Sequence, residues 1–160
     1  MSGSARILLR PARAAELPAL SGLCLRSKAH WGYDAAFLAA CREELTLTAE
    51  DLALSSVTVA EVSGRAVGVA QVAAVEEACD LCKLFVDPPA MGRGLGRALL
   101  AWVVAEARRM RARRLTIEAD PGAVPFYEKM GARHVGEAPS GSIPGRRLPL
   151  LELEIQSEVA

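Results

Sequence analysis

The stretch Val86-Asp-Pro-Pro-Ala-Met-Gly-Arg-Gly-Leu-Gly-Arg-Ala-Leu-Leu100 joins an apolar run to a helix-forming segment through alternate glycines. It predicts a strand, a glycine-rich turn and a long helix that continues to about Arg111. Glycines let the backbone approach a ligand closely, and the free N–H groups at a helix start point toward a bound anion. Arg93 and Arg97 add positive charge on the same side. The stretch therefore predicts a cradle for a phosphate or pyrophosphate group.

Two common phosphate-binding motifs do not describe this turn. The pattern Gly-x-Gly-x-Gly at residues 92–96 differs from the Gly-x-Gly-x-x-Gly of dinucleotide-binding folds, and no strand of that fold opens the chain. No Gly-Lys-Ser/Thr follows the turn, so it is not an ATP-binding P-loop either.

Upstream of the turn, the hydrophobic pattern predicts three consecutive strands. They cover residues 57–62, 66–75 and 79–86, with short turns at Ser63-Gly64 and Glu76-Glu77. Strands that follow one another through tight turns pair antiparallel.

The first third of the chain predicts one short strand followed by helices. The strand covers residues 6–10, and the helical patterns cover 12–28 and 37–45, the second capped by Asp34. Thr48 predicts a single further turn.

Downstream of the long helix, strands and one short helix alternate. We expect strands at residues 115–117, 133–135 and 148–155, and a helical segment through Lys129 that stops at Gly131. A strand, a helix and a strand in succession predict a crossover. The sequence therefore predicts a single domain over residues 1–160, an α+β fold with a mixed, mostly antiparallel sheet and helices on both faces.

Composition narrows the class of protein. The chain has 160 residues, 51% of them hydrophobic, and its 19 Lys and Arg balance its 19 Asp and Glu. A chain without an excess of Lys and Arg over Asp and Glu is not expected to be a nucleic-acid-binding protein. No apolar run approaches the roughly 18 residues of a membrane span, and Arg10 and Pro11 interrupt the N-terminal apolar run, unlike a signal peptide. We expect a cytoplasmic protein without a membrane partner.

The four cysteines do not predict a metal site. Cys79 and Cys82 form a C-x-x-C within a predicted strand, where residues three apart point to opposite faces. Cys24 and Cys41 stand alone, and the histidines are only two. We expect unreactive thiols and no metal.

The glycine-rich turn resembles the first motif of the Gcn5-related N-acetyltransferases, Gln/Arg-x-x-Gly-x-Gly/Ala, which binds the pyrophosphate of acetyl-CoA. It matches residues 91–96, with Met91 where the family usually has Gln or Arg. The stretch Asp120-Pro-Gly-Ala-Val-Pro-Phe-Tyr-Glu-Lys-Met-Gly-Ala132 resembles the second motif, Asn-x2-Ala-x2-Phe-Tyr-x-Lys-x-Gly-Phe. Asp120 replaces its Asn and Ala132 its last Phe. Residues 27–33 and 142–149 resemble a subgroup of the family for which we know no substrate.

The resemblance implies an enzyme that moves the acetyl group of acetyl-CoA, without a metal, to an amine by direct attack in a ternary complex. It also implies that the strand before the turn splays from its neighbour, so that its free backbone can bind the pantetheine arm. The residues that it implies for cofactor binding are Leu84, Phe85, Val86, Gly92, Arg93, Gly94, Leu95, Gly96, Arg97, Asp120, Phe126 and Lys129.

Tyr127 matches the residue that usually gives a proton to the sulfur of coenzyme A in this family. A phenol has a pKa of about 10 and a thiol of about 8.5, so complete proton transfer from the phenol to the thiolate is uphill by about 2 kcal/mol. We therefore expect Tyr127 to act more as a hydrogen-bond donor than as an acid.

The general base is left open between several residues. Glu118 ends the strand before the Tyr127 helix, Glu76 and Glu77 lie in a turn, and His30 follows the first helix. Each also suits a plain role, as a cap, a solvated turn or a surface residue.

The acceptor wall is equally open. Trp31 and Tyr33 suit such a wall, although Trp31 equally suits a core anchor. Arg146 and Arg147 could contact an acidic acceptor, and a solvated loop is the preferred interpretation.

Two other functions compete with the enzyme. One is a non-catalytic acyl-CoA sensor on the same fold, against which Tyr127 argues. The other is a protein that binds the phosphates of a different nucleotide. The acceptor, whether a small molecule or a protein amine, is not specified, and neither is the homodimer that is common on this fold.

Overall fold

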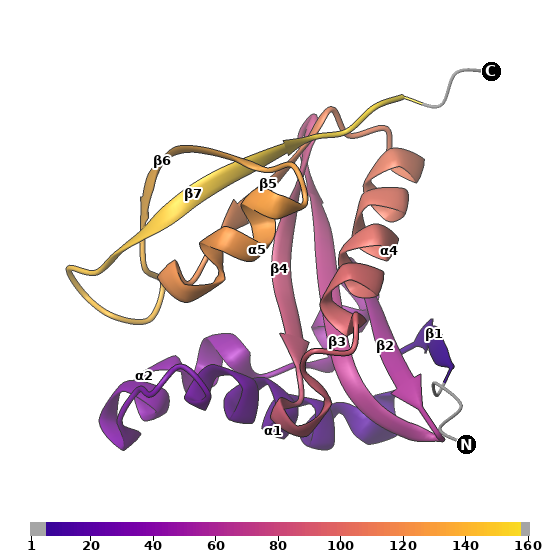
Figure 1. Cartoon of the computed structure of the whole chain (residues 1–160), viewed down its shortest axis with the longest axis vertical. Helices are drawn as coiled ribbons and strands as arrows, with labels where there is room; N and C mark the ends of the chain where they lie inside the picture. Colours follow the sequence, from indigo (N-terminus) through magenta and orange to yellow (C-terminus); the bar gives the residue numbers. More distant parts are fainter. Residues whose placement is uncertain (1–5, 158–160) are drawn as a thin grey trace.

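Seven strands form one mixed sheet in the order β1-β2-β3-β4-β5-β7-β6 (Figure 1). The computed structural model describes residues 6–157. The strands are β1 (Ile7–Pro11), β2 (Ser56–Val62), β3 (Arg65–Val75), β4 (Ala78–Val86), β5 (Arg114–Glu118), β6 (Arg133–Pro139) and β7 (Arg147–Glu154). All neighbours pair antiparallel except β4 and β5, which pair parallel through the crossover. The predicted mixed sheet and its meander are confirmed.

Five α-helices and three short 3-10 turns connect the strands. The helices are α1 (Leu17–Ala29), α2 (Ala35–Leu45), α3 (Ala49–Leu54), α4 (Leu95–Arg109) and α5 (Val124–Lys129), and the turns are η1 (Ala14–Glu16), η2 (Pro88–Ala90) and η3 (Pro121–Ala123). Asp34 caps α2 by accepting the Phe37 N–H at 2.8 Å, as expected. Thr48 and Asp51 cap each other's backbone, which supports a six-residue helix where we expected one turn.

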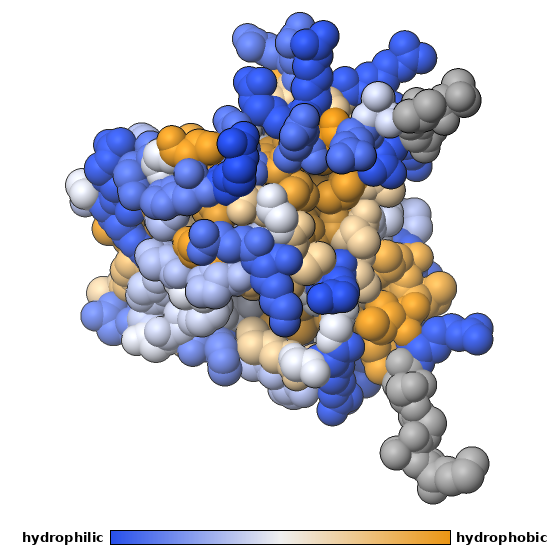
Figure 2. Space-filling view, turned by 45° about the horizontal axis from the view of Figure 1, so that its top comes forward, coloured by the Kyte–Doolittle hydropathy of each residue, from blue (hydrophilic) through white to orange (hydrophobic). Residues whose placement is uncertain are grey.

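The helices divide the hydrophobic core between the two faces of the sheet. Residues of α1 and α2 pack with β2 and β3 around Leu20, Leu23 and Val59. Residues of α4 and α5 pack on the other face around Leu99 and Val103. On the face shown in Figure 2, hydrophilic side chains surround patches of hydrophobic surface, as in ordinary globular domains.

The sheet opens between β4 and β5. Their pairing is limited to Ala78–Arg114, Cys79–Leu115 and Asp80–Thr116, although β4 continues to Val86. Figure 1 shows β5, β6 and β7 leaning away from the strands before the crossover. Within residues 6–157, one edge of β4 beyond Asp80 has no strand partner, which is the splay that the resemblance implied.

Some predicted boundaries were wrong. The first helix begins at Leu17 rather than at residue 12, because Pro11 still belongs to β1 and a 3-10 turn comes between. The long helix ends at Arg109 rather than near Arg111, whose φ of 59° lies outside the helical range. The strand β6 is longer than the predicted 133–135.

Candidate active site

A cavity of about 880 Å³ opens where β4 and β5 diverge. Its walls come from β4, β5, the turn before α4, the α5 segment, the α1–α2 side and the β6–β7 loop. The cavity therefore lies at the point in the fold where backbone groups of the sheet are free to meet a ligand.

The glycine-rich turn forms one end of the cavity. Gly92 and Gly94 both have φ of 81°, a left-handed conformation that side chains other than glycine rarely adopt. A Cβ atom at either position would meet no heavy atom within 4 Å. Gly94 is also the N-cap of α4. The backbone thus leaves open space in front of a helix N-terminus, which fits a phosphate group.

The helix start is held close to α5. A Cβ at Gly96 would lie 3.3 Å from the Phe126 ring. Phe126 packs edge-on to Tyr127, with ring centroids 5.1 Å apart. A side chain larger than glycine here would push α4 away from the ring that precedes Tyr127.

The strand β4 passes beside the cavity with one edge free. Leu84, Phe85 and Val86 pair with β3 on the other edge and line the cavity. Their side chains alternate, since Leu84 and Val86 pack against the α4 core and Phe85 against the α1 core. The free backbone of these residues can hydrogen-bond an extended ligand.

A β-bulge precedes this segment. Gln71 pairs with Lys83 and Val72 with Leu81, so β4 carries one extra residue, Cys82. The buried Lys83 donates from Nζ to Oε1 of the buried Gln71 at 3.0 Å. Gln71 in turn donates from Nε2 to Ser55 at 2.9 Å. A chain of polar side chains therefore fixes the bulge from within the sheet.

Tyr127 lies at the base of the cavity with 7% of its surface exposed. Burial raises its pKa above the ordinary tyrosine value. No buried side-chain oxygen or nitrogen of the described residues lacks a partner. Its hydroxyl makes no hydrogen bond to residues 6–157, so it must be open to the cavity. This hydroxyl stays protonated and is free to donate.

Three of the carboxylates that line this cavity are those of Glu44 on α2, Asp80 on β4 and Glu118 on β5. Burial, Glu44 and Asp80 raise the pKa of Glu118, in that order of effect. Glu44 accepts a hydrogen bond from Ser142, and Asp80 accepts one from Thr116. Glu118 is therefore the carboxylate of the three that is poised to take up a proton.

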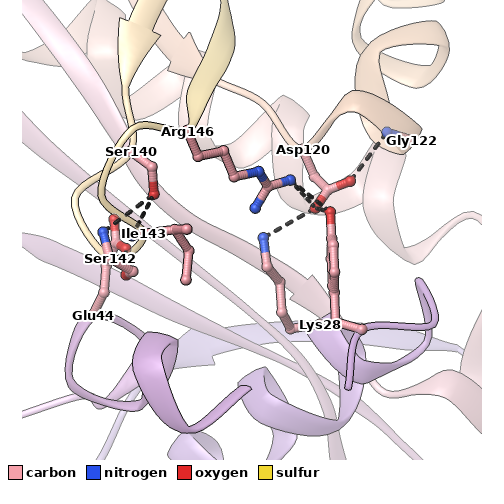
Figure 3. Close-up of polar contacts among 9 residues, drawn as sticks. Lys28, Glu44, Asp120, Gly122, Ser140, Ser142, Ile143 and Arg146 are labelled. Carbon is pink, nitrogen blue, oxygen red and sulfur yellow. Dashed lines mark hydrogen bonds and ion pairs between the residues drawn. The ribbon is translucent and has the colours of Figure 1, made fainter. Parts of the chain in front are cut away.

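Asp120 joins three segments that are distant in the sequence (Figure 3). Its carboxylate accepts from Lys28 Nζ at 3.0 Å and from the Tyr33 hydroxyl at 2.6 Å, and lies 3.8 Å from Arg146 Nη2. It also accepts the Gly122 N–H at 3.1 Å, which caps η3. Hydrogen bonds from Tyr33, Lys28 and Gly122 hold its pKa below the ordinary value despite burial.

Trp31 packs beside this cluster. A Cβ at Gly122 would lie 2.7 Å from the Trp31 ring, so glycine is required there for the α1–α2 segment to meet η3. Trp31 is 46% exposed and lines the cavity. It therefore lies at the wall rather than in the core.

The structure brings most predicted site residues to the cavity. Those that line it are Leu84, Phe85, Val86, Gly92, Gly94, Leu95, Gly96, Arg97, Glu118, Asp120, Phe126, Tyr127, Lys129 and Trp31. Tyr33 does not line the cavity, but its hydroxyl hydrogen-bonds Asp120 and Arg146, which do. Those outside its lining are Arg93, the exposed His30 and the exposed turn of Glu76 and Glu77.

The preferred interpretation of Arg146 and Arg147 as solvated is wrong for Arg146 only. Arg146 lines the cavity and donates to the Tyr33 hydroxyl at 2.7 Å. Arg147 is exposed and donates to the Glu137 carbonyl. The sequence did not predict a role for Lys83, Gln71 or Glu44, because only a bulge and contacts between distant elements bring them to the site.

The cysteines are free thiols. Cys79 is buried and Cys82 exposed, and they form no disulfide with each other, as expected. Within residues 6–157, no three His, Cys, Asp or Glu side chains are grouped so that they could hold a metal ion. In the same range, no helix is long and apolar enough to cross a membrane.

A family model described as "Acetyltransferase (GNAT) domain" matches residues 27–140. The chain belongs to the GNAT acetyltransferase family. The resemblance of the two sequence motifs is thereby confirmed, and with it an enzyme whose co-substrate is acetyl-CoA. The match includes the glycine-rich turn and Tyr127.

Solved GNAT structures share the whole fold at low sequence identity. A GCN5-related N-acetyltransferase from Rhodopseudomonas palustris has 20% identity and a TM-score of 0.78, over 96% of this chain and 99% of that one. The PaiA N-acetyltransferase from Thermoplasma acidophilum, in complex with coenzyme A, has 14% identity and a TM-score of 0.77, over 93% and 99%.

A third structure is the ribosomal-protein-alanine N-acetyltransferase from Brucella melitensis. It has 26% identity and a TM-score of 0.68, over 92% of this chain and 99% of that one. A search of curated proteins found no significant match. The expected GNAT fold is confirmed across nearly the full chain, and these likenesses leave the acceptor open.

Proposed function

We propose that this protein transfers the acetyl group of acetyl-CoA to the amine of an acceptor by direct attack in a ternary complex. The supporting observation is that one cavity holds the glycine-rich turn, the free edge of β4, the Tyr127 hydroxyl and the Glu118 carboxylate. Acetyl-CoA supplies the activated thioester, and the residues of the chain bind it, orient it and exchange protons around it.

The two ends of the cavity suit the two ends of the co-substrate. The Gly92 and Gly94 backbone and the start of α4 would hold the pyrophosphate, with Arg97 lining the same space. The free edge of β4 at Leu84 to Val86 would bind the pantetheine arm through backbone hydrogen bonds. Met91 lines the cavity without a charge, so the backbone would carry this binding.

Tyr127 would donate a hydrogen bond to the leaving sulfur. As the new N–C bond forms and the C–S bond breaks, negative charge develops on the sulfur. The pKa of Tyr127, raised by burial, keeps its proton in place, so it stabilises the thiolate as a donor.

Glu118 would accept the proton that the attacking amine loses. It lines the cavity, and its raised pKa makes it a better base than an ordinary carboxylate. His30 and the Glu76–Glu77 turn are weaker candidates, because they do not line the cavity.

Calorimetric titration with acetyl-CoA, ATP and NAD separates these ligands. We expect micromolar binding of acetyl-CoA alone, lost in Gly94→Glu, which places bulk and negative charge in the cradle.

Gly64→Glu is the matched control. Gly64 has φ of 78° and open space around it, but it lies in the β2–β3 turn away from the cavity. Binding of ATP or NAD in preference to acetyl-CoA would overturn the proposal. Binding of acetyl-CoA without thiol release for any amine would also contradict the proposed transfer.

A further inference from the structure

We infer that Arg146 and Lys28 form a carboxylate-binding corner in this cavity, and that the amine acceptor carries a carboxylate. The inference rests on the proposed acetyl transfer and names the class of its acceptor. It starts from the cluster around Asp120, where two cations, Lys28 and Arg146, approach one carboxylate (Figure 3).

The two cations are supported by an aromatic pair. Tyr33 and Phe37 stack with ring centroids 4.0 Å apart and an angle of 9° between the planes. Lys28 Nζ lies 5.2 Å from the Tyr33 centroid, and the Arg146 guanidinium carbon lies 5.1 Å from it and 4.9 Å from Phe37. Both cationic heads therefore pack beside this ring stack, at the wall of the cavity.

The charges of the corner do not cancel. Lys28 and Arg146 share one carboxylate, that of Asp120, and make no ion pair with any other acid among residues 6–157. Their side chains are only 14% and 20% exposed. One positive charge in excess, partly removed from water, favours an additional anion.

The guanidinium has donors to spare. Nη2 of Arg146 donates to the Tyr33 hydroxyl, and the remaining nitrogens have no partner in the described part of the chain. No buried polar atom there is unpaired, so these nitrogens are reachable from the cavity that Arg146 lines. A planar guanidinium suits a carboxylate, which it can bind through two parallel hydrogen bonds.

The loop that carries Arg146 is already fixed. The Arg146 N–H donates to the Ile143 carbonyl at 3.2 Å, and the Arg146 carbonyl accepts from Ser140 at 2.7 Å. Ser142 of the same loop donates to Glu44 of α2. A side chain held in place before the ligand arrives loses little conformational entropy on binding.

The separation of the corner from the proposed base suits a small acceptor. Asp120 follows Glu118 by two residues, about 6 to 7 Å along an extended chain. One small molecule can therefore place its amine at Glu118 and its carboxylate at Arg146. A diamine would instead bring a second positive charge toward the corner.

Matched pairs of acceptors test the inference. We would measure thiol release with amino carboxylic acids of increasing length, each beside its primary amide. A hydrogen bond to a charged group contributes about 1.5–3 kcal/mol, so we expect kcat/KM to be about 10- to 100-fold higher for the best acid than for its amide. Arg146→Gln should remove this preference, bringing kcat/KM for each acid down to that of its amide.

Arg147→Gln is the matched control, because Arg147 is exposed and outside the cavity lining. Arg146→Lys keeps the positive charge but loses the two parallel N–H donors of the guanidinium, so it should give an intermediate preference for acids over amides. Equal loss for acids and amides in Arg146→Gln would show a purely structural role and overturn the inference, as would a preference for amides or diamines.

A binding measurement covers acceptors outside the panel. The protein saturated with coenzyme A would be titrated with N-acetyl amino acids and their amides. Absence of a carboxylate-dependent difference in both turnover and binding overturns the inference. Titration of the ligand-free protein with acetyl-CoA, and thiol release with the amides, test the proposed function separately.

Discussion

Among single residues, Tyr127 is the one whose burial and chemistry separate binding from turnover. Its ring packs on Phe126 and its hydroxyl is free of protein partners among residues 6–157. Tyr127→Phe should lower kcat about 10²-fold, because only the donor to the leaving sulfur is lost. The Kd of acetyl-CoA, measured by calorimetry, should stay the same. A Kd weakened by the same factor as kcat would contradict the separate role.

Glu118 leads to a prediction about pH. A base must be ionised, and the pKa of Glu118 is raised by burial, Glu44 and Asp80. Activity should therefore fall with decreasing pH already above the usual carboxylate range. Glu44→Gln removes one source of the raised pKa, so the acid limb of the kcat profile should move to lower pH.

A matched variant isolates this effect. Glu43 is the exposed neighbour of Glu44 on α2 and is outside the cavity lining, so Glu43→Gln should leave the profile in place. An acid limb that survives in Glu118→Gln would assign the base to another group.

Sequence motifs predict the residues that are local to one turn or helix. Gly94 and Tyr127 could be assigned from adjacent residues alone, and both line the cavity. Arg146 could not, because its contacts are to Tyr33 and Asp120, far away in the chain. Its loop is rich in Gly, Pro and Ser, which favours the solvated interpretation until the partners are known.

Among the elements, β3 and β4 are joined by the buried hydrogen bond between Gln71 and Lys83. Removing either side chain leaves the other without its partner, and the two losses differ in cost. Lys83→Met leaves the side-chain amide oxygen of Gln71 without a donor, and we expect a loss of about 1–2 kcal/mol in unfolding free energy. Gln71→Leu leaves the Lys83 ammonium without its partner, which costs more, about 3 kcal/mol.

Urea unfolding of the two single variants and of the double variant measures this difference. The double variant removes both polar groups, so its loss should be smaller than the sum of the single losses. Additive losses, or a larger loss for Lys83→Met, would mean that the pair does not hold the bulge.

Local sequence patterns predicted the helices and strands well. They did not predict the bulge in β4 or the divergence of β5. Alternation of apolar residues predicted β2, β3 and β4 to within one residue at each end. The bulge at Cys82 leaves no mark in that alternation, because Leu81 and Lys83 flank it with ordinary strand residues. The divergence of β5 was expected only through family resemblance, since no residue type specifies it.

At the scale of the whole molecule, the proposed ligand would bridge two parts of the sheet that are weakly joined. Pairing between β4 and β5 stops at Asp80 and Thr116, and the cavity fills the opening that follows. The ligand would contact β4 on one side and α5 on the other. Acetyl-CoA should therefore stabilise the folded chain as a unit.

The size of this stabilisation can be stated in advance. A ligand at about 100 times its Kd adds about 2.7 kcal/mol to the unfolding free energy. In a chain of this size that corresponds to a rise in Tm of about 6–10 °C. Scanning calorimetry with and without acetyl-CoA measures the shift. Gly64→Glu should keep the full shift and Gly94→Glu should lose it, although both place Glu at a left-handed glycine with open space. An equal shift in both variants would remove the glycine-rich turn from the binding site, because the backbone strain is matched and only the position relative to the cavity differs.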